Sequence, residues 1–288
     1  MAWGLHGLAG GTLYQGRLEA SIRLAEESLA VRRELGDPHE VVVGLQYLGT
    51  RWVLAGRLEL AMPLFGETSG ILDRLGRPAP YPRGLQAWGL MLNGRYDEAQ
   101  DLAQRALAEA QAAAERRLIA WNGHVLGSLA LVRGDVASAR ERLQASADDF
   151  RALGEWVYWG MIFSFLGYAH YVAGQRERAQ GIFVEALKVG AKIRLPPIFA
   201  CALPGMALLY ADAGRPERAL ALCTVVRQCC HFVVNSTWFA DIAGPGYHAA
   251  IDSLDPEQVA AAEASVELSD VRAEAQAVLN EVGAGTGA

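Results

Sequence analysis

Residues 174–183 read Gly-Gln-Arg-Glu-Arg-Ala-Gln-Gly-Ile-Phe, and variants of this word recur along most of the chain. The leading glycines stand at positions 16, 56, 94, 134, 174 and 214, so the spacing between them is nearly constant. In the last five copies an alanine follows the glycine by five positions. A fixed period of about 40 residues is typical of proteins built from stacked structural repeats.

Each repeat unit has the pattern of two helices joined by a tight turn. The leading glycine can end the first helix in the left-handed conformation, and an acidic residue just after it suits the first turn of the second helix. Leu-Gly pairs such as Leu48-Gly49 and Leu166-Gly167 stand upstream of the glycine and provide a small residue for close helix approach. Alanines such as Ala61 and Ala179 are expected to fill the matching contact. No strand-like alternation competes with this pattern.

The combination of Leu-Gly, an aromatic residue such as Trp52 or Tyr210, Gly-x-x-Glu-x-Ala and a following Phe resembles the tetratricopeptide repeat (TPR). The usual TPR period is about 34 residues, so the longer unit of this chain implies longer helices or loops. HEAT-type repeats have a similar period, at about 40 residues, but they lack the glycine-centred word. The resemblance implies an all-α fold, namely a right-handed superhelical α-solenoid of about six TPR-like helix pairs with a C-terminal helical cap.

We predict six repeats within residues 1–232, followed by an irregular segment with capping helices at 233–282 and a disordered tail at 283–288. Helix starts are expected at Asp255-Pro256 and Asp270-Val271. Residues 232–250 break the period, and they are interpreted as a capping loop, with a functional lid as the alternative. The predicted repeat boundaries are 2–40, 41–79, 80–118, 119–158, 159–198 and 199–232.

Unit endings such as Arg33-Glu34-Leu35-Gly36-Asp37 look like the repeats of bacterial signalling ATPases and of maltose-regulator-type transcriptional regulators. In those proteins the repeats form a C-terminal sensor arm behind a nucleotide-binding module. The resemblance therefore implies a part in bacterial signalling or transcription regulation. The chain has no Gly-x-x-x-x-Gly-Lys-Ser/Thr loop, so no ATPase residue is assigned. The first helix is expected to begin without a polar cap, which suggests a fragment or an amino end packed on something else.

Composition excludes several partners and compartments. The net charge of −6 leaves no basic field for nucleic acid or for an anionic membrane surface. Residues 156–175 carry no formal charge and are long enough in principle to span a membrane. Their polar residues and their place in the repeat favour instead a helix surrounded on most sides by neighbouring helices. No secretory signal is visible at the start, so a cytoplasmic location is expected.

No catalytic, metal or cofactor site is predicted. Cys223, Cys229, Cys230 and His231 are close in sequence, and they are interpreted as small buried residues, with a thiol metal or redox site as the alternative. No nucleophile, base and orienting group can be nominated together. We therefore expect a non-enzymatic protein, and a helical-array enzyme remains the alternative from another functional class.

The first helices of the units are expected to line a concave groove with aromatic, uncharged side chains. Such a face suits an apolar peptide or a partner helix, and a small neutral ligand such as a sugar is the alternative. A third interpretation is that these rings only fill the core between helices. The sequence leaves open whether the chain forms a homo-oligomer. The candidate partner-binding residues are Gln46, Thr50, Tyr81, Trp88, Trp121, His124, Ser128, Met161, Ser164, Tyr168 and Tyr171, and the same register adds Trp3, His6 and Cys201.

Overall fold

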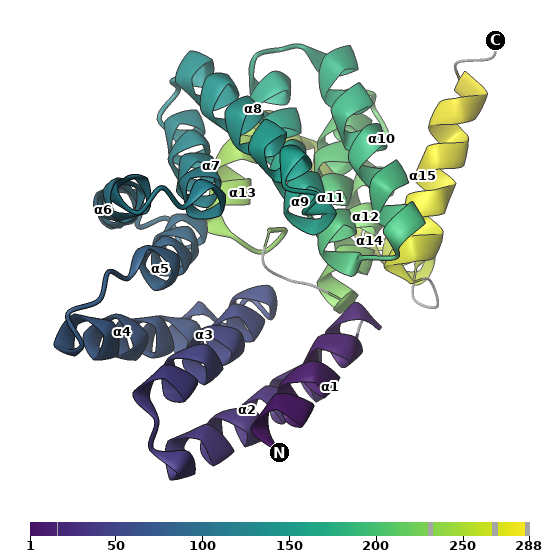
Figure 1. The fold of residues 1–288 in the computed structure, drawn as a ribbon. Coiled ribbons are helices and arrows are strands. Elements are labelled where there is room, and N and C mark those ends of the chain that lie inside the picture. The colour runs from purple at the N-terminus through teal and green to yellow at the C-terminus, as the bar shows by residue number, and fades with distance from the viewer. Residues whose placement is uncertain (16, 230–232, 267–269, 286–288) are drawn as a thin grey trace. The chain divides into compact units, whose positions relative to one another are not determined.

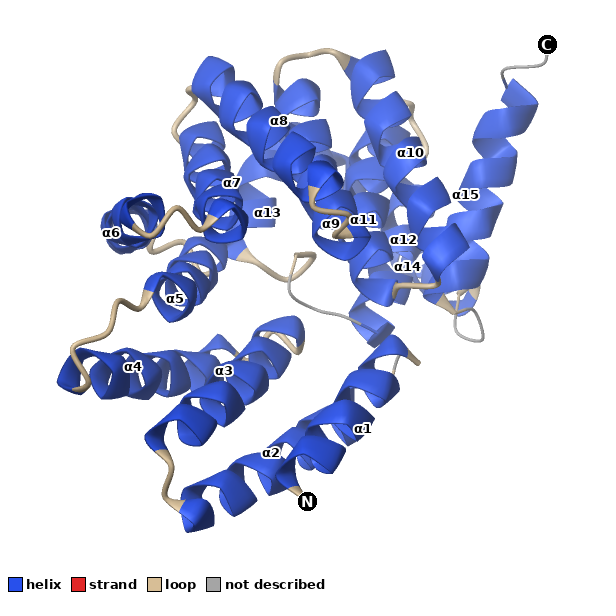
Figure 2. Ribbon diagram, viewed as in Figure 1, coloured by secondary structure: helices blue, strands red, loops and turns tan. Residues whose placement is uncertain are grey.

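The computed structural model describes residues 1–15, 17–229, 233–266 and 270–285, and all regular secondary structure within these ranges is helical (Figure 2). The chain divides into two compact units, Met1–Leu129 and Ala130–Ala288. In the described part, no helix combines the length and the apolar character that crossing a bilayer requires. The all-α prediction is confirmed.

The first unit contains helices that pack consecutively, each on the next from α1 to α6 (Figure 1). Helix α7 begins in this unit and continues past its last residue. The bounds are α1 (Ala2–Tyr14), α2 (Leu18–Leu35), α3 (Pro38–Leu54), α4 (Leu58–Arg74), α5 (Pro80–Leu92), α6 (Tyr96–Ala112) and α7 (Arg116–Val132).

The second unit repeats the consecutive packing from α8 to α12, and α9 also contacts α11. Three further helices follow this series. The bounds are α8 (Val136–Ala152), α9 (Trp156–Val172), α10 (Arg176–Ile193), α11 (Pro196–Asp212), α12 (Pro216–Cys229), α13 (Thr237–Asp252), α14 (Pro256–Ala264) and α15 (Val271–Gly285).

The turn glycines adopt the conformation that the repeat word requires. Gly56, Gly94, Gly134, Gly174 and Gly214 have φ between 70° and 80°, in the left-handed region that L-residues with a side chain seldom enter. An acidic residue lies in the first turn of α2, α4, α6, α10 and α12, where the helix macrodipole favours negative charge. The predicted turns are therefore confirmed at these five glycines, and Gly16 lies outside the described residues.

Within a pair, a phenylalanine of the second helix packs directly on the glycine of the first. A Cβ placed on Gly49 would lie 2.5 Å from Cε1 of Phe65, and one on Gly167 would lie 2.5 Å from Cε1 of Phe183. Both rings are fully buried, as is Ala61. The close approach expected at these glycines is thus made by the phenylalanine four residues after the alanine.

The glycine contact gives a testable prediction for stability. Gly49→Ala is expected to lower the free energy of unfolding by about 1–3 kcal/mol, because the new methyl group overlaps a ring that has no free space to move into. Gly66→Ala is the matched control: Gly66 is an exposed glycine inside α4 with nothing near its Cβ position, so the change should stabilise by about 0.5–1 kcal/mol. Urea denaturation of both variants measures the difference. Equal effects of the two substitutions would contradict the packing account.

Residues 237–252 are helical, so the expectation of an irregular segment or loop there was wrong. Helix α13 bends at Gly244, which has φ 70° and ψ 175° and precedes Pro245. The side chains of Trp238, Phe239 and Ile242, which precede the bend, are buried. Helix α13 packs on α11 and α12. The sequence pattern failed here because the Gly-Pro step masks the helical periodicity.

The last two helices begin where the sequence predicted. Asp255 caps α14 through a capping box with Gln258, and Asp270 accepts hydrogen bonds from two amides in the first turn of α15. Helix α14 packs on α12, and α15 packs on α10, α11 and α12. Helix α15 continues past the expected end near Val282 to Gly285, and residues 286–288 of the expected tail lie outside the described residues.

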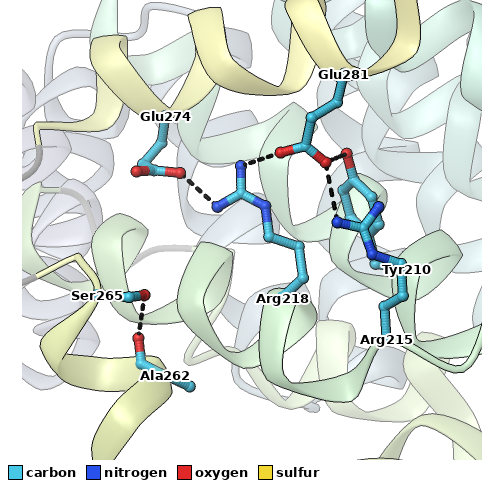
Figure 3. A network of polar contacts seen from close by, with 7 residues as sticks. All are labelled: Tyr210, Arg215, Arg218, Ala262, Ser265, Glu274 and Glu281. Carbon is cyan, nitrogen blue, oxygen red and sulfur yellow. Dashed lines mark hydrogen bonds and ion pairs between the residues drawn. The ribbon is translucent and has the colours of Figure 1, made fainter. Parts of the chain in front are cut away.

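Ion pairs and hydrogen bonds join α15 to the helix pair formed by α11 and α12 (Figure 3). The guanidinium of Arg218 donates to Glu274 at 2.6 Å and pairs with Glu281 at 2.8 Å. Glu281 also accepts hydrogen bonds from Tyr210 at 2.9 Å and from Arg215 at 3.2 Å. These donors lower the pKa of Glu281 below its ordinary value even though partial burial acts in the opposite direction.

Removing the central guanidinium should release α15. Arg218→Gln is expected to lower the free energy of unfolding by about 1.5–3 kcal/mol, because two partly buried carboxylates lose their charged donor. Amide hydrogen exchange should accelerate through residues 271–285. Arg151→Gln, at an exposed arginine of α8, controls for the loss of one positive charge. Unchanged exchange in α15 of the Arg218 variant would show that the network does not hold this helix.

Candidate functional site: the inner helix face

The candidate binding residues fall on four helices, and most of them are buried. Gln46 and Thr50 lie on α3 and Tyr81 lies on α5, and these three are half-buried. The expectation that the whole set lines an open groove was wrong for the other eight. The buried members are Trp88, Trp121, His124, Ser128, Met161, Ser164, Tyr168 and Tyr171.

In the first unit, three of the buried members form an aromatic cluster between α5 and α7. The rings of Trp88 and Trp121 meet edge to face with centroids 5.5 Å apart, and His124 lies 5.2 Å from Trp121. A Cβ on Gly84 would come within 2.7 Å of Oδ1 of Asn122, so these two helices approach closely at this point. The rings of Trp88 and Trp121 belong to the core because each packs against the first helix of the neighbouring pair and is buried from solvent.

Asn122 is a polar residue of this cluster that the sequence reasoning missed. It is fully buried, and its Nδ2 donates to the Leu118 carbonyl at 2.8 Å. Its Oδ1 has no hydrogen-bond donor among the described residues. Nothing in the sequence alone identifies Asn122 as part of this cluster. Its position opposite Gly84 depends on how α5 and α7 pack.

Burial strongly changes the acid–base behaviour of His124. Desolvation lowers the pKa of His124 to about 3, so the imidazole is neutral at neutral pH. A histidine with a depressed folded-state pKa binds its proton more readily after unfolding. Its contribution to stability is therefore complete above pH 6.5, the ordinary pKa, and is lost as the pH falls below that value.

This linkage predicts a pH-dependent stability. As the pH falls from 6.5 to 4.5, the His124 term should lower the free energy of unfolding with a slope that rises to about 1.4 kcal/mol per pH unit. His124→Gln should flatten that part of the profile, whereas the same change at the exposed His39 should leave it unchanged. Urea titrations at a series of pH values provide the measurement. A variant profile parallel to that of the unmodified chain would contradict the buried neutral imidazole.

In the second unit, two aromatic residues of α13 pack against Tyr168, one of the candidate residues of α9. The Tyr168 ring meets Trp238 at 5.4 Å, Phe239 at 6.2 Å and Phe183 at 5.2 Å, and its hydroxyl donates to the Cys201 carbonyl at 2.8 Å. Tyr171 donates to Asp212 at 3.1 Å, and Ser164 donates to the Gly160 carbonyl within its own helix. Sequence reasoning could not place α13 on this face, because the contact joins segments that are far apart along the chain.

A partly exposed aromatic and cationic group lies on α1, α2 and α3. His6 stacks on Tyr47 with centroids 3.6 Å apart, and the Arg51 guanidinium lies 3.2 Å from the Tyr47 ring centroid. Arg32 lies over Trp3, which is 60% exposed. Partial burial and the two arginines lower the pKa of His6. Sequence reasoning named Trp3 and His6 but missed Tyr47 and both arginines, which come from other helices.

The described residues contain no group of three or more potential metal ligands close enough to hold an ion. Cys201 and Cys223 are buried free thiols, and burial raises the pKa of each. The sulfur of Cys223 lies 3.2 Å from the Tyr247 hydroxyl. Cys223 is therefore a core residue of α12, while Cys230, His231 and the side chain of Cys229 lie outside what the structure describes.

Comparison with known proteins supports the repeat assignment. Residues 2–40 match the tetratricopeptide repeat family, and these are the bounds predicted for the first unit. No curated protein matches the sequence.

Among the solved structures similar to this chain, two with TM-scores above 0.5 share its fold. A Rap protein complexed with competence and sporulation factor is 13% identical, covers 90% of this chain and 72% of its own, and has a TM-score of 0.60. NprR in complex with its cognate peptide NprX is 13% identical, covers 100% of this chain and 86% of its own, and has a TM-score of 0.57. A signal transduction ATPase with a tetratricopeptide repeat sensor from Pyrococcus horikoshii is 16% identical over 97% of this chain and 43% of its own, with a TM-score of 0.48. The chain is therefore a protein of tetratricopeptide-like fold whose first helix pair carries the family's sequence pattern.

Proposed function

We propose that this chain is a non-enzymatic scaffold or sensor domain that binds a peptide, or a peptide segment of a protein, through the face formed by its first helices. The observation that carries the proposal is the position of α13. In the second unit this helix places Trp238 and Phe239 against Tyr168 and packs on α11. This internal contact supports the proposal because it is made by a helical segment with aromatic anchors, which is a common mode of peptide recognition.

The first unit has the residues through which an external peptide would bind. Gln46, Thr50 and Tyr81 keep partial exposure on α3 and α5, which contact each other. The Gln46 amide can donate to and accept from a peptide backbone, and Tyr81 offers a rigid ring with a polar tip. None of the three carries a charge, so we expect an apolar or neutral peptide rather than an acidic one.

The fold neighbours favour the same ligand class. The Rap and NprR structures are complexes with a factor and with a cognate peptide. We assign the chain, as part of this proposal, to the sensor arm of a bacterial signalling or transcriptional regulator in the cytoplasm. The repeat endings that resemble those arms support the assignment.

Selection from a random peptide library against the full chain tests the proposal. Fluorescence anisotropy then measures the affinity of the selected peptides. Gln46→Ala and Tyr81→Ala should each weaken binding about 5- to 50-fold, as expected for interface anchors. Gln104→Ala, at an exposed position of α6, should leave the affinity unchanged.

Three outcomes would refute the peptide proposal. One is a library that yields no binder. Another is a set of peptides whose affinity is indifferent to both changes in the face. The third is saturable binding of neutral sugars that depends on Gln46 and Tyr81 while peptides fail to bind, because it would assign the face to a small ligand instead.

A further inference from the structure

The second unit contains an open pocket of about 430 Å³ between α8, α9 and α10. Its size is within the range of small-molecule sites. All of its lining residues belong to the second unit, and none belongs to the candidate peptide face. The residues used below are Arg140, Glu141 and Gln144 of α8, Leu166 and His170 of α9, and Arg178 of α10.

The two arginines of this pocket lack the carboxylate partners that several other arginines in the chain have. Across the described residues, Arg140 and Arg178 take part in no ion pair, whereas arginines such as Arg83 and Arg218 each contact two carboxylates. Nε of Arg140 is buried and has no hydrogen-bond acceptor in the described part of the chain. A buried charged donor without an acceptor is costly, so an anionic ligand would supply what the fold leaves unmet.

His170 adds an imidazole to the two guanidinium groups of the pocket. The residue is 2% exposed, and its Nδ1 lies 2.6 Å from Oε1 of Gln175, which fixes the ring plane. Burial and the nearby Arg178 and Arg140 lower the pKa of His170. The two arginines therefore make the electrostatic potential at this ring positive.

The remaining lining residues narrow the class of ligand. Glu141 is a single carboxylate against two guanidinium groups, so the lining keeps a positive balance, and it can accept a hydrogen bond from a ligand hydroxyl. Leu166 supplies an apolar wall, and the Gln144 amide can donate as well as accept. Two guanidinium groups in one lining carry two positive charges, which suit the nearly doubly charged phosphate of a monoester better than a singly charged carboxylate.

We propose that this pocket binds a small phosphate monoester, with Arg140 and Arg178 holding the phosphate and Glu141 and Leu166 facing the rest of the molecule. The site is independent of the peptide proposal. It gives the chain a second recognition site, for a small phosphorylated ligand, on residues of α8, α9 and α10.

Isothermal titration calorimetry of the full chain with inorganic phosphate, phenyl phosphate and phenol tests the site. We expect saturable binding of phosphate, tighter binding of phenyl phosphate and no binding of phenol. Arg140→Gln and Arg178→Gln should each weaken phenyl phosphate binding about tenfold or more. Arg142→Gln removes the same charge from an exposed position on α8 outside the pocket, and it should change the affinity less than twofold.

Circular dichroism and thermal unfolding establish that each variant keeps the fold. To keep the test decisive if Arg140→Gln unfolds, Arg178→Gln is read alone, because its side chain is exposed. No saturable phosphate binding, or equal losses in the Arg178 and Arg142 variants, would overturn the proposal. Preference for a phosphoserine peptide over phenyl phosphate would overturn the small-molecule assignment and indicate a protein ligand.

Discussion

Two helix pairs, α3–α4 and α9–α10, depend on the contact between a buried phenylalanine of the second helix and a glycine of the first. Phe65 lies on Gly49 and Phe183 lies on Gly167, in corresponding positions of two different helix pairs. The Phe183 ring also lies where a Cβ of Gly205 would be, so one side chain joins α10 to both α9 and α11. Because a glycine has no side chain to displace, the ring can reach the helix backbone and set the separation within and between pairs.

Local features of this architecture could be predicted from the sequence. A left-handed glycine such as Gly174 is needed wherever a helix must end in a tight turn, and that need is visible in the word itself. The starts of α14 and α15 follow from the Asp-Pro and Asp-Val steps, because an aspartate there accepts hydrogen bonds from amides of the first helical turn. These signals involve residues within one or two turns of each other, so no tertiary information is required.

The burial of the residues on the first helices could not be predicted in the same way. The repeat register assigned Tyr168 to the groove, but its ring is in contact with Trp238 of α13. The sequence does not reveal α13 as a helix, because the Gly244-Pro245 step interrupts its helical pattern. Trp121 is buried for a related reason, since its ring meets Trp88 of another repeat. The repeat register predicts on which face of a helix a residue lies. Whether that residue is buried depends on the segments that pack on the face, and these are distant in sequence. The group of Arg140, His170 and Arg178 was missed because its members come from three helices.

The central claim is that the face formed by the first helices of the pairs, and not the second helices, recognises peptide. An experimental structure of the full chain bound to a library-selected peptide tests this claim most directly. The account predicts peptide density against α3 and α5, with contacts to Gln46, Thr50 and Tyr81. Density confined to the second helices of the pairs, α2, α4 and α6, would contradict it.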